Sequence, residues 1–196
     1  MNILNQKKKK FEKGLSLIES AMVLALAATV TAGVMFYYQS ASDSNKSQSA
    51  ISLVMSATSA INGLYIGQAG YSGLDSSVLI NSSAIPDTYK DKTKNSINNP
   101  FGGKLIPVAA NTTAAGSFGY ALTLEGLPKS ACISLATLNL GTSAKGYGIG
   151  IDTPAGTNSF GSSAAKGSAK GTPITPAEAA AACQDENNNS VTYFMK

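Results

Sequence analysis

Few residues of this chain could do covalent chemistry. The sequence has no His, which removes the usual general base, the Ser-His-Asp and Cys-His nucleophile systems and His metal sites. Ser163 and Lys166 match the Ser-x-x-Lys pattern of some acyl-transfer enzymes, but they lie in a Gly/Ser/Ala-rich segment without the companion motifs. The glycines of 146–150 alternate as in a strand and lack the spacing and Lys of a phosphate loop. We expect no catalytic residue, no metal site and no cofactor.

The two cysteines, Cys132 and Cys183, are too few for a four-Cys zinc site. An even pair in a chain that crosses a membrane predicts a disulfide formed in an oxidising compartment. Two free buried thiols are the alternative. A bridge would close a loop of about 50 residues, for which chain entropy predicts a stabilisation of roughly 4 kcal/mol.

Gly14 separates a charged segment from an apolar one. Residues 1–14 hold five Lys and one Glu, so the rest of the chain holds ten Lys and ten acidic residues and is neutral. The basic pI therefore belongs to the first segment and does not indicate a nucleic-acid partner. A Lys cluster beside an apolar span predicts retention on the cytoplasmic side of a membrane.

The apolar segment from Leu15 to Tyr38 is 24 residues long, enough to span a bilayer as a helix. Its small residues Ala21, Ala25, Ala28 and Ala32 recur at spacings of four, three and four, which places them on one helical face that another helix could approach closely. A lipid-facing anchor that happens to be Ala-rich is the alternative.

Glu19 is the one charged residue of the apolar segment. A carboxylate costs about 2–3 kcal/mol inside a membrane helix, so such residues usually have a partner. A carboxylate at the membrane surface that stabilises the helix N-terminus is one interpretation. Pairing with the cleaved amine of Leu15 in a neighbouring subunit is the other.

The junction Gly14-Leu15-Ser16-Leu17-Ile18-Glu19, after a Lys-rich leader, resembles that of type IV prepilins. Leu in place of Phe as the first mature residue resembles the type IVb class, although a leader of 14 residues is short for that class. The resemblance extends over the whole chain, including the segment from Thr175 and the ending Val191–Lys196, and is strongest to the major subunits of bundle-forming pili.

This resemblance implies the following roles. A prepilin peptidase would cut between Gly14 and Leu15 and methylate the Leu15 amine, Glu19 would be the assembly carboxylate, and Cys132 and Cys183 would close the C-terminal region. The partners would be further copies of the chain, the inner membrane before assembly, the assembly machinery with its outer-membrane secretin, and the host cell surface. The leader would be cytoplasmic, the head periplasmic, and the assembled fibre extracellular.

The residues that follow the span predict the elements of an α+β head. We expect residues 1–14 to be the leader, 15–38 the membrane and assembly part of a long helix, 39–64 its amphipathic half, and 65–196 the head domain. A break into two helices at Ser40–Ser44 is the alternative, but that segment lacks Pro and Gly. In the amphipathic half, apolar side chains and one Thr recur at helical spacing: Ile51, Val54, Met55, Thr58, Ile61 and Leu64. We expect the stripe of Ile51, Val54 and Ile61 to be buried against a sheet.

Residues 68–104 contain turn signals and are expected to be irregular. The alternation of Phe118, Tyr120, Leu122 and Leu124 with small or polar residues predicts a strand. Residues 104–108 are its expected hairpin partner, and 147–151 and 191–195 are further strands. Short helices are predicted at 128–138 and from Thr175, where Thr175, Pro176 and Glu178 form a capping box. The predicted fold is the type IV pilin fold, a long helix on an antiparallel sheet.

The sequence thus predicts the major structural subunit of a type IVb pilus, which mediates aggregation and adherence, and not an enzyme. A pseudopilin of a secretion machine shares the junction, and a single-span adhesin or periplasmic enzyme would keep the leader.

Overall fold

The computed structural model describes residues 16–111 and 118–196. The chain divides into two compact units, and the boundary between Ala41 and Ser42 falls within helix α1 (Leu17–Leu64). Residues 40–44 are helical, so the alternative of two helices with a joint there is wrong. The physical reason is the one that the sequence indicates: no Pro or Gly interrupts the hydrogen-bond ladder at this point.

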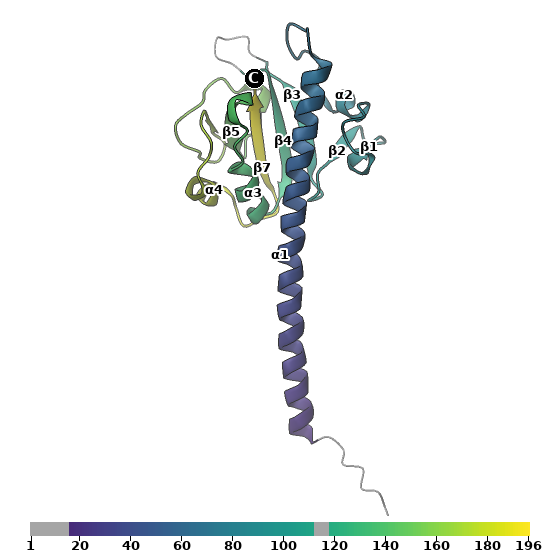
Figure 1. Ribbon diagram of the computed structural model, residues 1–196. Helices are drawn as coiled ribbons and strands as arrows, with labels where there is room; N and C mark the ends of the chain where they lie inside the picture. The colour runs from purple at the N-terminus through teal and green to yellow at the C-terminus, as the bar shows by residue number, and fades with distance from the viewer. Residues whose placement is uncertain (1–15, 112–117) are drawn as a thin grey trace, which may run out of the picture. The chain divides into compact units, whose positions relative to one another are not determined.

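The second unit contains one antiparallel sheet of seven strands (Figure 1). Its order is β1-β2-β3-β4-β7-β5-β6, so the C-terminal strand lies in the interior of the sheet. The strands are β1 (Lys90–Asp91), β2 (Ser96–Asn98), β3 (Lys104–Ala109), β4 (Tyr120–Leu127), β5 (Ala144–Ile149), β6 (Ala169–Lys170) and β7 (Asn189–Met195).

Alternation along β4 and β7 builds a core on each face of this sheet. Tyr120, Leu122 and Leu124 belong to the larger cluster, with Val191 and Tyr193 of β7. The intervening Ala121 and Phe194 belong to a smaller cluster with Phe118, Ile151 and Ala169 on the opposite face. Since successive side chains of a strand point to opposite faces, one sequence period supplies both layers.

The predicted strand around residue 120 is confirmed, with one correction. Phe118 precedes β4 and packs edge-on against Phe194, with ring centroids 4.8 Å apart, in the smaller cluster. It does not share a face with Tyr120, because the strand begins only at Tyr120 and the alternation cannot be extended backwards. The predicted hairpin of β3 with β4 is present in the register Leu105 opposite Leu124.

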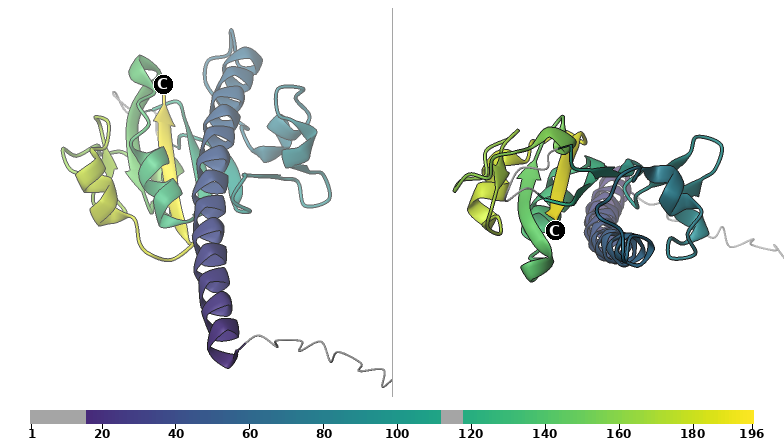
Figure 2. Two further views of the ribbon diagram at one scale, coloured as in Figure 1. Left: turned by 60° about the horizontal axis from the view of Figure 1, so that its bottom comes forward. Right: turned by 90° about the horizontal axis from the view of Figure 1, so that it is seen from above.

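The second half of α1 lies against one face of the sheet (Figure 2), and its buried side chains belong to the larger cluster. The predicted stripe of Ile51, Val54 and Ile61 is confirmed at Val54 and Ile61, which are fully buried. Met55 and Leu64 are exposed, and Ile51 and Thr58 are half-buried. Small residues approach the sheet most closely, which shifts the buried stripe to Ala50, Leu53, Val54, Ala57, Ala60 and Ile61.

The segment predicted to be irregular contains regular structure, so that expectation is wrong. Helix α2 (Ser76–Ile80) begins at Asp75, whose carboxylate accepts the N–H groups of Ser77 and Val78. The 3₁₀ turn η1 (Asp87–Tyr89) then leads into β1 and β2. These elements are only a few residues long, so they leave no periodic pattern in the sequence.

Helices α3 (Lys129–Ala136) and α4 (Pro176–Ala182) form where the sequence predicts them. The Thr175 hydroxyl accepts the Glu178 N–H at 3.4 Å, and the Glu178 carboxylate accepts the Thr175 N–H at 2.9 Å. The capping box therefore begins α4 as expected. Two further 3₁₀ turns, η2 (Gly141–Ser143) and η3 (Pro154–Gly156), complete the described elements.

Candidate functional site: the apolar helix and the disulfide-closed region

The described part of the first unit is an apolar helix whose side chains are not buried by other residues. Residues 17–40 of α1 have no buried side chain. This helix is long and apolar enough to cross a membrane, and no other described helix is. Twelve large apolar side chains are more than half exposed: Leu17, Ile18, Met22, Val23, Leu24, Leu26, Val30, Val34, Met35, Phe36, Tyr37 and Tyr38.

An apolar surface of this size is unfavourable in water, because each large apolar side chain gains roughly 1.5–3 kcal/mol on burial. Three of its hydroxyl side chains form hydrogen bonds within the helix. The Thr29 and Thr31 hydroxyls each donate to a backbone carbonyl four residues earlier at 2.8 Å. The Ser20 hydroxyl donates to the Leu17 carbonyl at 3.0 Å. The helix can therefore be covered by lipid or by other helices without stranding these hydroxyl groups.

Glu19 lies in the first turn of α1 and is exposed. Its carboxylate accepts the Ser16 N–H at 2.9 Å, so it turns back toward the N-terminal end of the helix. Free N–H groups and the helix dipole both favour a negative charge there. The predicted cleavage residue Gly14 and the predicted methylation residue Leu15 lie outside the described residues.

The face predicted for close helix packing is uncovered. Ala21, Ala25, Ala28 and Ala32 are exposed, and Gly33 has open space where a Cβ would stand. These residues present a smooth strip on which a second helix could lie.

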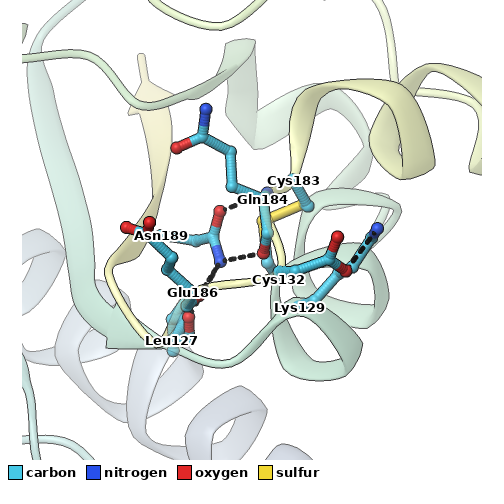
Figure 3. A network of polar contacts seen from close by, with 8 residues as sticks. Leu127, Lys129, Cys132, Cys183, Gln184, Glu186 and Asn189 are labelled. Carbon is cyan, nitrogen blue, oxygen red and sulfur yellow. Dashed lines mark hydrogen bonds and ion pairs between the residues drawn. A yellow bond between two sulfur atoms is a disulfide. The ribbon is translucent and has the colours of Figure 1, made fainter.

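Cys132 of α3 and Cys183 at the end of α4 form the predicted disulfide (Figure 3). Their Cα atoms are 6.0 Å apart, and both residues are buried. The described residues contain no free cysteine, so the alternative of two free thiols is wrong.

A buried amide that the sequence analysis missed lies beside this disulfide (Figure 3). The Asn189 amide nitrogen lies within hydrogen-bond distance of the carbonyls of Leu127, Gln184 and Glu186, at 3.1, 2.9 and 2.8 Å. Its oxygen accepts the Gln184 N–H at 2.7 Å. Asn189 thus joins the start of β7 to the end of β4 and to the chain just after Cys183. A polar residue in an Asn run gives no sequence signal for burial.

A second missed interaction joins β6 to α4. The Lys170 ammonium donates to both oxygens of Glu178, at 2.9 and 2.7 Å. Lys170 is buried, and Glu178 also accepts the N–H and the hydroxyl of Thr175. The Lys170 ammonium, followed by the Thr175 donors, lowers the pKa of Glu178 to about 2.

Of the two motifs that resembled chemical sites, the glycines of 146–150 are explained by packing, and the Ser-x-x-Lys motif is not. A Cβ on Gly146 would stand 2.4 Å from the Phe160 ring, and a Cβ on Gly148 would stand 2.2 Å from Ile151. The alternate glycines therefore allow the chain of 150–170 to lie close on β5. Ser163 is an exposed loop residue. Among the described residues, no three acids or cysteines gather where they could hold a metal.

Comparison with known proteins identifies close relatives. The model of the family described as Bundlin matches residues 39–194. Two relatives, from Escherichia coli O111:H- and Escherichia coli O127:H6 (strain E2348/69 / EPEC), are each described as the major structural subunit of bundle-forming pilus. Each is 71% identical over 189 residues, which cover 96% of this chain and 96% of the relative.

Two solved structures share the fold. The type IVb pilin from Salmonella typhi has a TM-score of 0.55 at 16% identity, covering 78% of this chain and 99% of that one. TcpA, a type IV pilin from Vibrio cholerae El Tor, has a TM-score of 0.50 at 18% identity, covering 76% of this chain and 98% of that one. The predicted type IV pilin fold is confirmed.

Proposed function

The chain belongs to the Bundlin family, and from this membership we propose that it is the major structural subunit of a type IVb pilus. The observation that carries the proposal is the uncovered apolar helix of residues 17–40, in a chain 71% identical to named pilus subunits. Such a helix needs either a bilayer or other helices around it. When a subunit leaves the membrane and enters a fibre core, the lipid around its helix is replaced by the helices of other subunits. The role is structural and not catalytic.

The proposed sequence of events begins in the inner membrane, with the Lys-rich leader on the cytoplasmic side and the head in the periplasm. A prepilin peptidase cuts after Gly14 and methylates the amine of Leu15. The assembly machinery then stacks the helices, and the fibre passes through an outer-membrane secretin. The fibres associate with one another and adhere to host cells, which makes the exposed head the adhesive part.

Glu19 has a defined part in this assembly. In the fibre core its carboxylate pairs with the Leu15 amine of a neighbouring copy, which sets the stagger between helices. The orientation of the carboxylate supports this role. It points toward the helix N-terminus, where it accepts the Ser16 N–H at 2.9 Å, and an N-terminal amine is a donor of the same kind. In the fibre core a charge left without its partner would be costly.

The first test is the mass of the mature chain purified from sheared fibres. We expect a chain that begins at Leu15 and carries one methyl group. A start at Met1 or Asn2 contradicts the proposal and favours a single-span protein that keeps its leader. Cleavage without surface fibres in electron micrographs favours a pseudopilin.

The second test replaces Glu19. Removing one partner of a buried ion pair costs roughly 3–5 kcal/mol, so we expect Glu19→Ala to lower fibre yield about a hundredfold or more. Leader cleavage should stay near normal, because the carboxylate acts only after the cut. Ser20→Ala is the matched control, since the Ser20 hydroxyl is bonded within its own helix. Normal fibre yield from Glu19→Ala would show that the carboxylate has no assembly role.

A further inference from the structure

An apolar groove of about 560 Å³ lies on the head, between the second half of α1 and the segment that joins α3 to β5. It is separate from the apolar helix and from the disulfide-closed region. None of its lining residues is charged: Ile51, Met55, Thr58, Ser59, Asn62, Leu138, Asn139, Leu140, Ser143 and Met195.

The wall of the groove opposite α1 is held in place by hydrogen bonds. The Leu140 N–H donates to the Tyr147 hydroxyl at 3.0 Å, and that hydroxyl donates to the Asn139 side chain at 3.4 Å. The Lys196 N–H donates to the Ser143 carbonyl at 3.0 Å. On the α1 wall, the Tyr120 hydroxyl donates to Asn62 at 3.2 Å. The groove is therefore preformed and need not open to receive a partner.

The α1 wall of the groove includes apolar side chains that the sheet does not fully bury. Met55 is 56% exposed, and Ile51 is half-buried, although both lie on a helix that otherwise packs on the sheet. These residues form a second apolar face of α1, which the chain itself leaves open. One wall of the groove is thus formed by the helix whose first half is proposed to pack in the fibre core.

In a fibre of identical subunits, a surface on one copy meets a different surface on the next, because the contact is repeated along the fibre and does not close. An uncharged apolar groove therefore needs an uncharged apolar projection elsewhere on the same chain. The stretch from Asn62 to Leu74 contains no charged residue. In the second unit, Leu64 and Ile66 are, besides Met55, the described large apolar side chains that are at least half exposed.

Ile66 is 82% exposed and Leu64 is 50% exposed, and we refer to residues 64–66 as the knob. The residue between them is anchored: the Tyr65 ring lies 5.4 Å from the Tyr71 ring, and the Tyr65 N–H donates to the Ile61 carbonyl at 3.0 Å. The Tyr71 ring in turn lies 4.6 Å from the Tyr120 ring. The knob is thus held at the end of α1 with its apolar side chains in solvent.

We propose that the knob of one copy occupies the groove of the next copy in the fibre. This contact between head domains would add to the packing of the apolar helices. This inference rests on the proposed function, since it requires a polymer of this chain. The contact joins two surfaces of the head, the knob and the groove, and neither surface is covered by other residues of its own chain.

Cross-linking in assembled fibres tests the contact directly. The variant Met55→Cys/Ile66→Cys keeps both native cysteines and is exported, assembled, sheared and treated with a short bis-maleimide. We expect a ladder of dimers, trimers and longer species on denaturing electrophoresis. Fibres in which the two single variants are mixed should give dimers only, and each single variant alone should stay monomeric. The control Ser162→Cys/Ile66→Cys, with an exposed cysteine outside the groove, should give no ladder.

Each other result overturns the inference. Wild-type-like fibres without a ladder show that the knob does not occupy the groove. Dimers from a single variant show a symmetric contact, and a ladder from the control shows unspecific linking. If the wild-type chain is cleaved but forms no fibres, the proposed function fails and the contact fails with it.

A charge placed in the groove or on the knob supplies the second measurement. Met55→Lys and Ile66→Lys should each lower fibre yield by at least about tenfold, the factor that corresponds to 1.4 kcal/mol. Both side chains are exposed, so the thermal midpoint of the mature chain in detergent should not change, and leader cleavage should continue. Normal fibre yield from both variants contradicts the contact. Loss of yield from Met55→Lys alone shows that a different surface fills the groove.

Discussion

Two buried asparagines hold the end of β4. The ladder between β4 and β7 shifts between Leu124 and Leu127, which frees carbonyls in this bulge. The Asn99 amide donates to the Glu125 carbonyl at 2.7 Å, and the Asn189 amide donates to the Leu127 carbonyl at 3.1 Å. Each amide thus donates to a backbone carbonyl at this irregularity of the sheet, and buried carbonyl groups are costly when unsatisfied.

At this scale we predict that Asn189→Ala is strongly destabilising. Four backbone groups around Asn189, one buried and three partly buried, would lose this partner, so the free energy of unfolding should fall by about 3 kcal/mol. Denaturant unfolding of the mature chain in detergent measures this. Asn188→Ala is the matched control, because Asn188 is exposed, and its effect should stay within about 0.5 kcal/mol. Equal effects of the two variants would contradict the role of the buried amide.

The sequence identifies residues whose chemical type is rare in its surroundings. Glu19 stands out in an apolar run, and the two cysteines pair because no other cysteine competes. Asn189 stands in a run of three asparagines, and only the fold places one of them in a buried site and leaves Asn188 exposed.

At the scale of elements, patterns longer than a few residues predict well. α1 is predicted by its apolar length and α4 by its capping box, since both depend on local interactions. The face of α1 that packs on the sheet is not local. Ala50, Ala57 and Ala60 are buried, whereas the larger Met55 and Leu64, which recur at helical spacing with Val54 and Ile61, are exposed.

Helix α4 supplies a prediction on pH. The pKa of Glu178 is lowered from its ordinary value near 4.5 to about 2. A lowered pKa means that the carboxylate stabilises the fold above its unfolded pKa, and that this stability is lost as the pH falls from about 4.5 to about 2. The thermal midpoint of the wild-type chain should decrease over this window.

Glu178→Gln should have a lower thermal midpoint than wild type at neutral pH and a smaller decrease over the acidic window. The reason is that the amide cannot pair with the Lys170 ammonium as a charge. Glu186→Gln is the control, because the Glu186 side chain is exposed and makes no hydrogen bond or ion pair with the described residues. A Glu178→Gln profile that parallels the wild type would rule out this source of acid sensitivity.

At the scale of the whole molecule, the two units differ in how they are stabilised. Every residue of both core clusters lies at or after Ala50, within the second unit. The described residues of the first unit have no buried side chain. Their apolar side chains would be buried only by a membrane or by other helices of a fibre. We therefore expect the head to fold without the apolar helix and the proposed fibre to require it.

We predict that a fragment of residues 42–196 folds without detergent and remains monomeric. Its thermal midpoint should lie within a few degrees of that of the mature chain in detergent, because both clusters and the disulfide are retained. It should form no fibres at any concentration tested. Circular dichroism and sedimentation measure these properties, and an unfolded or fibrous fragment would contradict the division of roles.

The sequence by itself determined the apolar segment, the charge boundary at Gly14, the disulfide partners and the helix starts, because these follow from composition and from interactions a few residues apart. Only the tertiary structure decided which face of α1 meets the sheet, which asparagines are buried and where an apolar groove stays open. These features depend on how surfaces distant in sequence fit together, and the fit depends on side-chain size across two elements that the pattern of either one alone does not contain.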